Sequence, residues 1–221
     1  MRRRLDELRQ REKTALQTRG WDPEGLADVL KTLTECWLRR AEHWPFLKNV
    51  ERVAAQGQQR PTLHLLLEQR LSPTGPDLRR GVACLLAPEG KTLTAQLERL
   101  LKLEEPPDQL VLVHEERTPL KPGAQGRTNL AGLRDVYGEN LHVIALSHDE
   151  QSLLFALKGV LGQANSPEFE VDLADGQSRR IGRAEALDAL LRDDALVGAR
   201  LLRLLVKTEV AEGTLLAAAS E

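Results

Sequence analysis

The pattern of hydrophobic positions in the first third of the chain is that of amphipathic helices. Residues 2–18 carry a thin apolar stripe on an otherwise charged segment. A broad stripe follows Asp22-Pro23-Glu24, which supplies a side-chain cap, a proline at the first helical position and an acid at the positive helix end. This broad stripe recurs at helical spacing at Leu26, Val29, Leu30, Leu33, Cys36 and Trp37. We therefore expect residues 1–77 to form a helical N-terminal region.

Three segments of this region have weaker patterns. The thin stripe of residues 2–18 is too narrow to stabilise a helix alone, so we expect this helix to lean on a partner segment or on upstream chain. Residues 46–55 are predicted to form a further short helix after Trp44-Pro45. Residues 62–71 lie between breaks rich in Gln, Gly and Pro, and their pattern assigns neither a helix nor a strand.

From Gly81 onward, short apolar runs alternate with helical stripes. Strands are predicted at residues 82–86, 110–113 and 141–146. Helices are predicted at residues 91–103, over the stripe of Leu130, Leu133, Val136 and Tyr137, and from Ser147 to about Gly162, where Ser147-His148-Asp149-Glu150 forms a capping box. Because strands separated by helices form right-handed crossovers, we expect residues 81–163 to contain a parallel sheet of at least three strands.

The last part of the chain predicts a small separate unit. Residues 168–173 and 178–181 are expected to pair as a hairpin turned by Asp175-Gly176, and helices are predicted at residues 183–192 and 195–206. The predicted fold class is thus α/β, with a helical N-terminal part, a Rossmann-like parallel sheet in the middle and a small hairpin-plus-helices C-terminal unit. The corresponding domain ranges are 1–77, 78–165 and 166–208, followed by a frayed tail at 209–221.

Composition narrows the class of protein. The hydrophobic (41%) and charged (29%) fractions are those of a globular protein. A net charge of −2 excludes a globally basic nucleic-acid binder, although local patches still act over a Debye length of about 8–10 Å.

Cys36 and Cys84 lack the partner spacing of a zinc site or a disulfide framework, so we expect no metal, no cofactor and a reducing compartment. No apolar run is long enough to span a membrane, so the expected location is the cytoplasm, with no membrane partner. The sequence indicates no oligomeric state.

The segment Ala87-Pro88-Glu89-Gly90-Lys91-Thr92 resembles the end of a phosphate-binding P-loop. That loop needs a glycine five positions before Gly90, where this chain has Leu85. A plain strand-to-helix turn is therefore favoured over nucleoside-triphosphate binding, and an anion at the helix start is the alternative.

Residues 114–128 form a longer connection at the carboxyl end of a predicted central strand, where open parallel sheets bind their ligands. Its basic side chains could meet an anion near the next helix, with Thr128 as the helix cap; the alternative is a surface loop with local ion pairs. The residues predicted to gather at this edge as an anion- or ligand-binding face are Lys91, Thr92, Arg117, Lys121, Arg127 and Ser147.

The sequence contains no complete catalytic motif. Pro107-Asp108 followed by Glu115-Glu116-Arg117 is faintly similar to the carboxylate motif of restriction-type nucleases, but the spacing is short and Arg117 replaces a lysine. The histidines at 64, 114, 142 and 148 lack metal-ligand spacing, and no Ser or Cys nucleophile motif is present. No residue is assigned a catalytic role.

The C-terminal unit is locally basic, and a hairpin beside two short helices could be a winged-helix-like reader of DNA phosphates. The alternative is an ordinary solvated helix face, because the arginines follow helical spacing. The candidate nucleic-acid-binding residues are Arg179, Arg180, Arg183, Arg200 and Arg203.

The run from Leu110 to Leu120, together with Leu201-Leu202-Arg203-Leu204-Leu205, resembles accessory C-terminal segments of large prokaryotic ATPases associated with DNA or defence. The resemblance covers residues 81–206, and it departs at His114, where an arginine is expected. It implies a non-catalytic recognition or coupling module that binds a protein or nucleic-acid partner. Two alternatives stay open: a phosphate-ligand enzyme or nucleotide sensor that uses loops 87–92 and 114–128, and a divergent metal-dependent nuclease.

Overall fold

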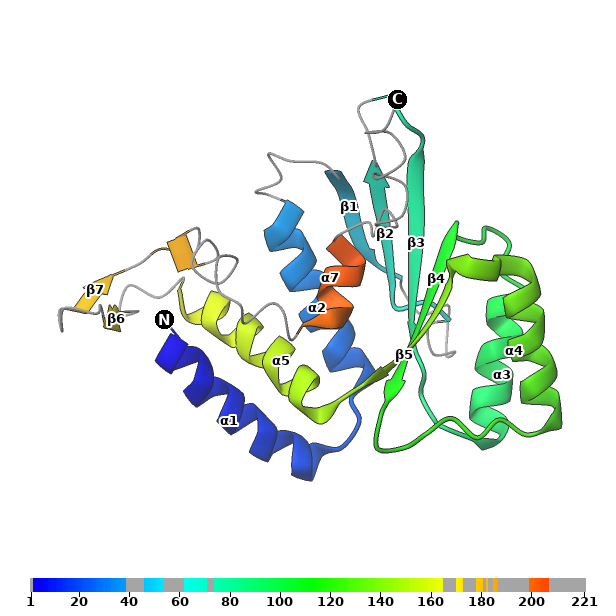
Figure 1. Ribbon diagram of the computed structural model, residues 1–221, viewed down its shortest axis with the longest axis horizontal. Helices are drawn as coiled ribbons and strands as arrows, with labels where there is room; N and C mark the ends of the chain where they lie inside the picture. Colours follow the sequence, from blue (N-terminus) through cyan, green and yellow to red (C-terminus); the bar gives the residue numbers. More distant parts are fainter. Residues whose placement is uncertain are drawn as a thin grey trace, which may run out of the picture.

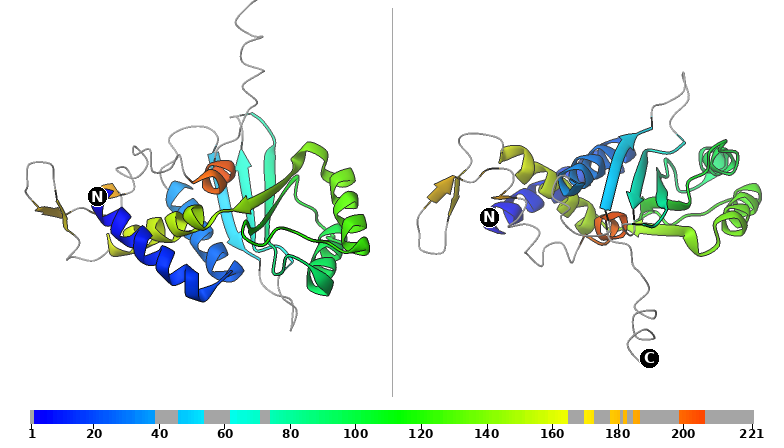
Figure 2. Two further views of the ribbon diagram at one scale, coloured as in Figure 1. Left: turned by 60° about the horizontal axis from the view of Figure 1, so that its bottom comes forward. Right: turned by 90° about the horizontal axis from the view of Figure 1, so that it is seen from above.

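The computed structural model describes residues 2–38, 46–53, 62–70, 74–164, 170–172, 178–180, 182, 185–186 and 199–206. A central five-stranded sheet lies between two layers of helices (Figures 1 and 2). The helices are α1 (Arg2–Arg19), α2 (Pro23–Leu38), α3 (Gly90–Leu101), α4 (Ala124–Tyr137), the short 3-10 helix η1 (Gly138–Asn140), α5 (His148–Gln163) and α7 (Arg200–Val206). The strands of the sheet are β1 (Phe46–Arg52), β2 (Leu65–Arg70), β3 (Asp77–Cys84), β4 (Gln109–Glu115) and β5 (Leu141–Leu146). The α/β fold class is therefore confirmed.

The strands follow one another across the sheet in the order β1-β2-β3-β4-β5. Strands β3, β4 and β5 pair in parallel, which confirms the parallel sheet predicted for residues 81–163. Strands β1 and β2 extend this sheet by antiparallel pairing with β2 and β3. The sheet thus includes strands from both sides of residue 77, and β1 and β5 form its two edges.

The short helix predicted at residues 46–55 is wrong, because Phe46–Arg52 is strand β1. Its pairing with β2 runs from Phe46↔Arg70 to Arg52↔Leu65 and contains a register shift between Leu47 and Asn49. That shift interrupts the two-residue alternation of a strand, so the apolar positions took on a spacing typical of a helix. Residues 62–71, which the pattern left unassigned, contain β2.

Alternating side chains of the strands supply two separate cores. Val82 and Cys84 of β3 face a layer that contains α1, α2, α5 and α7, whereas Ala83 faces the layer of α3 and α4. Helix α1 packs along α5, and its Leu5 and Leu8 side chains are buried in the same core as those of α5. Thus α5 is the partner segment on which the thin stripe leans.

The apolar stripe predicted for the second helix is correct in part. Val136 of α4 was predicted to lie on this stripe, but it is 64% exposed, while Leu133 and Tyr137 are buried as predicted.

The predicted hairpin strands are present as β6 (Glu170–Asp172) and β7 (Ser178–Arg180), paired antiparallel. Residues 173–177, with the predicted turn, and most of the predicted helix at 183–192 lie outside the described residues. Within the described part of the chain, no helix has the length and apolar character needed to cross a membrane.

Helix α7 is held at both ends by buried polar side chains. At its N-terminal end, Glu150 Oε1 accepts a hydrogen bond from the Leu201 amide at 2.7 Å. At its C-terminal end, Arg80 Nη1 donates to the carbonyl oxygens of Leu204 (2.5 Å) and Leu205 (3.1 Å). A carboxylate at the positive end and a guanidinium at the negative end both oppose the helix dipole. These contacts fix α7 to α5 at one end and to β3 at the other.

Candidate functional site

Two of the predicted ligand-binding residues, Lys91 and Lys121, lie together at the N-terminal ends of α3 and α4. They line a hollow of ≈ 630 Å³. The loops that carry them are joined by a parallel bridge between Glu89 and Lys121, and the Lys121 amide donates to the Pro88 carbonyl at 2.8 Å. Parallel strands β3 and β4 deliver both loops to the same edge, as expected.

The charge of this hollow is balanced rather than positive. Glu89 and Glu98 line it beside Lys91 and Lys121. Neither helix start has a side-chain cap, so their free amide groups favour negative charge, but the two carboxylates oppose a further anion. The hollow therefore lacks the surplus positive charge typical of a phosphate site.

The other four predicted residues do not line this hollow. Arg117 donates through Nε to Glu115 at 2.7 Å, and Arg127 Nη1 donates to the Pro122 carbonyl at 3.2 Å. Ser147 caps α5, where its hydroxyl accepts from the Glu150 amide at 3.1 Å. Thr92 is exposed in the first turn of α3.

Of the two predicted helix caps, the one on α5 is correct and the one on α4 is not. Thr128 was expected to cap the helix of the second loop, which is wrong, because α4 begins four residues earlier and its N-cap is Gly123. Thr128 instead donates within the helix to the Ala124 carbonyl at 3.2 Å. In the predicted capping box Ser147 acts as expected, whereas the Glu150 carboxylate turns to Leu201 of α7.

The carboxylates of the nuclease alternative lie at opposite ends of β4. Asp108 precedes the strand and accepts from the Arg79 amide at 2.7 Å. Glu115 is the last residue of the strand, about 20 Å away at the usual rise of a β-strand. Two carboxylates so far apart cannot hold one cation, and the described residues contain no cluster of His, Cys, Asp and Glu suited to a metal ion.

A buried polar cluster lies where α2, β1 and β2 meet. His64 is fully buried; its Nδ1 accepts from the Cys84 amide at 3.2 Å, and its Nε2 lies 3.6 Å from Glu24 Oε1. Burial lowers the pKa of His64 from 6.5 to about 4, although Glu24 opposes this shift. Arg52 forms ion pairs with Glu24 and Asp28 and supplies the positive charge there. The cluster holds a neutral histidine that joins the sheet to α2.

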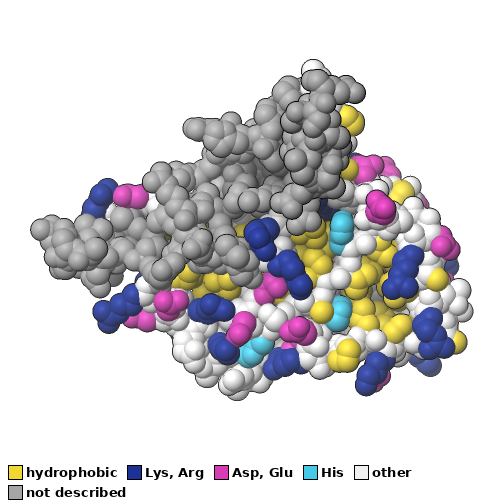
Figure 3. Space-filling model, viewed as in Figure 1, with side chains coloured by type: hydrophobic (Ala, Val, Ile, Leu, Met, Phe, Trp, Pro, Cys, Tyr) yellow, Lys and Arg dark blue, Asp and Glu magenta, His cyan; other side chains and the backbone are white. Residues whose placement is uncertain are grey.

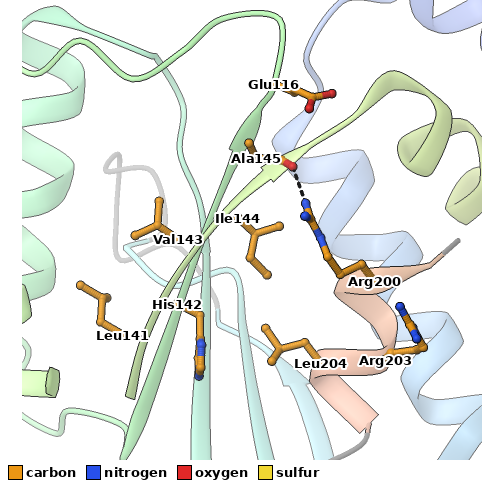
Figure 4. Close-up of a pocket in the computed structure, with 9 residues that line it drawn as sticks. All are labelled: Glu116, Leu141, His142, Val143, Ile144, Ala145, Arg200, Arg203 and Leu204. Atoms are coloured by element: carbon orange, nitrogen blue, oxygen red, sulfur yellow. Dashed lines mark hydrogen bonds between the residues drawn. The ribbon is translucent and has the colours of Figure 1, made fainter. Parts of the chain in front are cut away.

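A second hollow, of ≈ 540 Å³, lies between the edge strand β5 and helix α7 (Figure 4). Its lining residues are Glu116, Leu141, His142, Val143, Ile144, Ala145, Arg200, Arg203 and Leu204. We call it the β5 groove. In Figure 4, Ile144 and Leu204 point toward one another across it, while Val143 points to the opposite side of the strand.

The main chain of β5 presents hydrogen-bonding groups to this groove. The Leu146 carbonyl accepts from the Glu116 amide at 3.0 Å and so faces β4. Because N–H and C=O groups alternate sides along a strand, those of Leu141, Val143 and Ala145 face the open edge. The Ala145 carbonyl accepts a hydrogen bond from Arg200 Nη2 at 2.7 Å, and the Leu141 amide donates to the Gly138 carbonyl. Within the described residues, both groups of Val143 and the Ala145 amide have no partner.

The two faces beside this edge differ in chemistry. On the α7 side, the side chain of Arg200 is 60% exposed and lies 3.9 Å from Glu150, while Arg203 forms no ion pair with any described residue. Burial raises the pKa of Glu150, and the backbone hydrogen bond from Leu201 and the nearby arginines oppose the rise. On the α4 side, the side chain of Val143 is 41% exposed. On the face of the molecule seen in Figure 3, hydrophobic side chains lie next to basic ones.

The predicted nucleic-acid residues are therefore divided between separate places. Arg200 and Arg203 line the β5 groove, whereas Arg179 and Arg180 belong to β7, on the far side of α1 and α5 (Figure 1). Arg179 pairs with Glu185 at 2.7 Å, and Arg183 lies outside the described residues. The β5 edge was not among the predicted sites; the signal in the sequence is that residues 141–146 are the last strand of the parallel run, which can place them at the edge of the sheet.

Comparisons with known proteins returned no matching family model, no matching curated protein and no matching solved structure.

Proposed function

We propose that this chain is a non-catalytic recognition module that binds a protein partner by accepting an extended segment of it as a sixth strand beside β5. The observation that supports this proposal is the outward-facing main chain of Val143, which has no partner within the described residues and lies beside the exposed Val143 side chain and two arginines. Strand addition uses such an edge for affinity and the flanking side chains for specificity. The accessory-segment resemblance supports a coupling role within a larger prokaryotic assembly.

The two faces of the groove define the chemistry of the partner segment. Successive side chains of an added strand point to opposite faces. Those on the α4 side would contact Val143, and those on the α7 side would meet Arg200 and Arg203. The favoured segment therefore alternates apolar and acidic residues.

A peptide fits this edge better than a nucleic acid does. Val143 offers a donor and an acceptor side by side, which a peptide strand satisfies together, whereas a phosphate only accepts hydrogen bonds. The groove also contains Glu116, which repels a polyanion more than it repels a peptide with spaced acidic residues. The buried thiol of Cys84, which forms no disulfide, supports the proposed cytoplasmic location, where thiols stay reduced.

The experiment measures fluorescence anisotropy of a labelled peptide of alternating Val and Glu. Matched probes are a peptide of alternating Val and Lys and a single-stranded oligonucleotide of equal charge. We expect the acidic peptide to bind and the basic peptide not to bind. Val143→Pro should abolish binding because it removes the outward amide, and edge strands tolerate proline at such positions. Val143→Ala keeps that amide and should retain most of the affinity.

A charge variant tests the second face of the groove. Arg203→Glu should lower the affinity for the acidic peptide by about tenfold or more, because it replaces electrostatic attraction by repulsion. Equal binding by the Val143→Pro and Val143→Ala variants would contradict strand addition. Tighter binding of the oligonucleotide than of the acidic peptide would indicate that the partner is a nucleic acid and not a protein.

A further inference from the structure

The hairpin of β6 and β7 is too small to be stable as an isolated unit. Each strand has three residues, and the two pair only with one another within the described residues. A two-stranded hairpin is marginal in water and gains stability when a third strand joins it. Figures 1 and 2 show this hairpin projecting from the α1 and α5 end of the molecule, away from the central sheet.

The sequence of this hairpin matches the chemistry of the β5 groove. Glu168-Phe169-Glu170-Val171-Asp172-Leu173 alternates acidic and apolar residues without interruption, and β6 is its centre. Strand β6 pairs with β7 along one edge, so its other edge is available within the described residues. The groove offers what such a strand needs: an unpartnered main chain, an apolar face and an arginine face.

We infer that β6 of a second copy of this chain pairs with β5, so that the hairpin of one molecule extends the sheet of another. This inference rests on the proposed function, because it uses the same edge. Strand β6 and strand β5 of one chain lie on opposite sides of α1 and α5 (Figure 1), which favours pairing between copies. Reciprocal exchange of two hairpins would close the assembly as a two-fold dimer.

Charge complementarity supports the second copy as the occupant. Glu170 and Asp172 supply two negative charges to an edge where Arg200 and Arg203 supply two positive ones. A partner protein with a similar acidic segment would compete for the same edge. Self-association would then hold the edge closed until such a partner displaces β6.

The experiment measures self-association of the full chain by sedimentation velocity across a range of concentrations. We expect the unmodified chain to associate. Glu170→Lys/Asp172→Lys should be monomeric yet should still bind the alternating Val/Glu peptide, because its β5 edge is intact. Val143→Pro should lose both properties. The matched control is Glu51→Lys/Glu104→Lys, which makes the same charge change at exposed acids elsewhere and should associate normally.

Mixing variants separates the two strands of the contact. Equal amounts of Val143→Pro and Glu170→Lys/Asp172→Lys should associate, because one copy retains β6 and the other retains β5. A monomeric unmodified chain, or normal association of Glu170→Lys/Asp172→Lys, would overturn the inference while peptide binding still supported the proposed function. Failure of peptide binding in a monomeric Glu170→Lys/Asp172→Lys chain would instead refute the proposed function.

Discussion

Acidification is expected to destabilise the fold through the buried His64. Its folded-state pKa of about 4 lies below the ordinary value of 6.5, chiefly because burial disfavours the charged ring. The unfolded chain therefore binds more protons than the folded chain between these two values. The stability that this difference supplies is complete above pH 6.5 and is lost as the pH falls toward 4.

The size of the effect follows from the two pKa values. The full shift corresponds to about 3 kcal/mol. Integrating the proton uptake gives a loss of about 1 kcal/mol by pH ~5.5 and about 2–3 kcal/mol by pH ~4.5. Glu24, Arg52 and Cys84 face this ring, and the first two act in opposite directions on its charge.

The assay is urea unfolding at a series of pH values, compared with the variant His64→Asn. The asparagine oxygen can accept from the Cys84 amide in place of Nδ1, but it does not titrate. The variant should lose less stability than the unmodified chain on acidification, and the difference should reach about 2–3 kcal/mol by pH ~4.5. Parallel pH profiles for the two proteins would refute the assignment of a neutral, buried His64.

The remaining predictions concern stability, measured by urea unfolding. Arg80→Met should lower the free energy of unfolding by about 1–3 kcal/mol, because the Leu204 and Leu205 carbonyls at the end of α7 lose a charged donor; an unchanged free energy of unfolding would show that Arg80 does not stabilise α7. Leu16→Ala should cost about 2–5 kcal/mol, since this side chain is fully buried between α1 and its neighbours; a loss below ~1 kcal/mol would mean that α1 contributes little. Arg117→Ala should cost about 1–3 kcal/mol, because Glu115 is buried and loses its main donor, whereas Lys121→Ala should cost under ~1 kcal/mol; equal costs would contradict this ranking.

The parallel core could be predicted because its strands are short apolar runs separated by helical stripes. Strand β1 could not, since the register shift beside Leu47 removed its two-residue alternation. The order of strands in a sheet is also absent from a hydrophobic pattern. Leu141–Leu146 is almost entirely apolar and resembles a central strand, yet β5 lies at the edge and exposes Val143.

The residues of the candidate ligand site could be predicted only where the order and direction of the strands alone determine where a residue lies. Lys91 and Lys121 meet because each follows a parallel strand, as the sequence analysis expected. Arg117 does not reach them, because Glu115 two residues earlier binds it. The carboxylates that balance the hollow, Glu89 and Glu98, come from a cap position and a helix interior, and no short motif marks them.

Residue-resolved amide hydrogen exchange of β5, with and without the alternating Val/Glu peptide, tests the central claim most directly. The amides of Val143 and Ala145 face the open edge and should exchange rapidly in the monomeric Glu170→Lys/Asp172→Lys chain. Saturating peptide should slow both, while the Leu141 amide, already bonded to Gly138, should change little. Unchanged exchange at Val143, with protection instead around Lys91 and Lys121, would contradict strand addition and would assign binding to the hollow between α3 and α4.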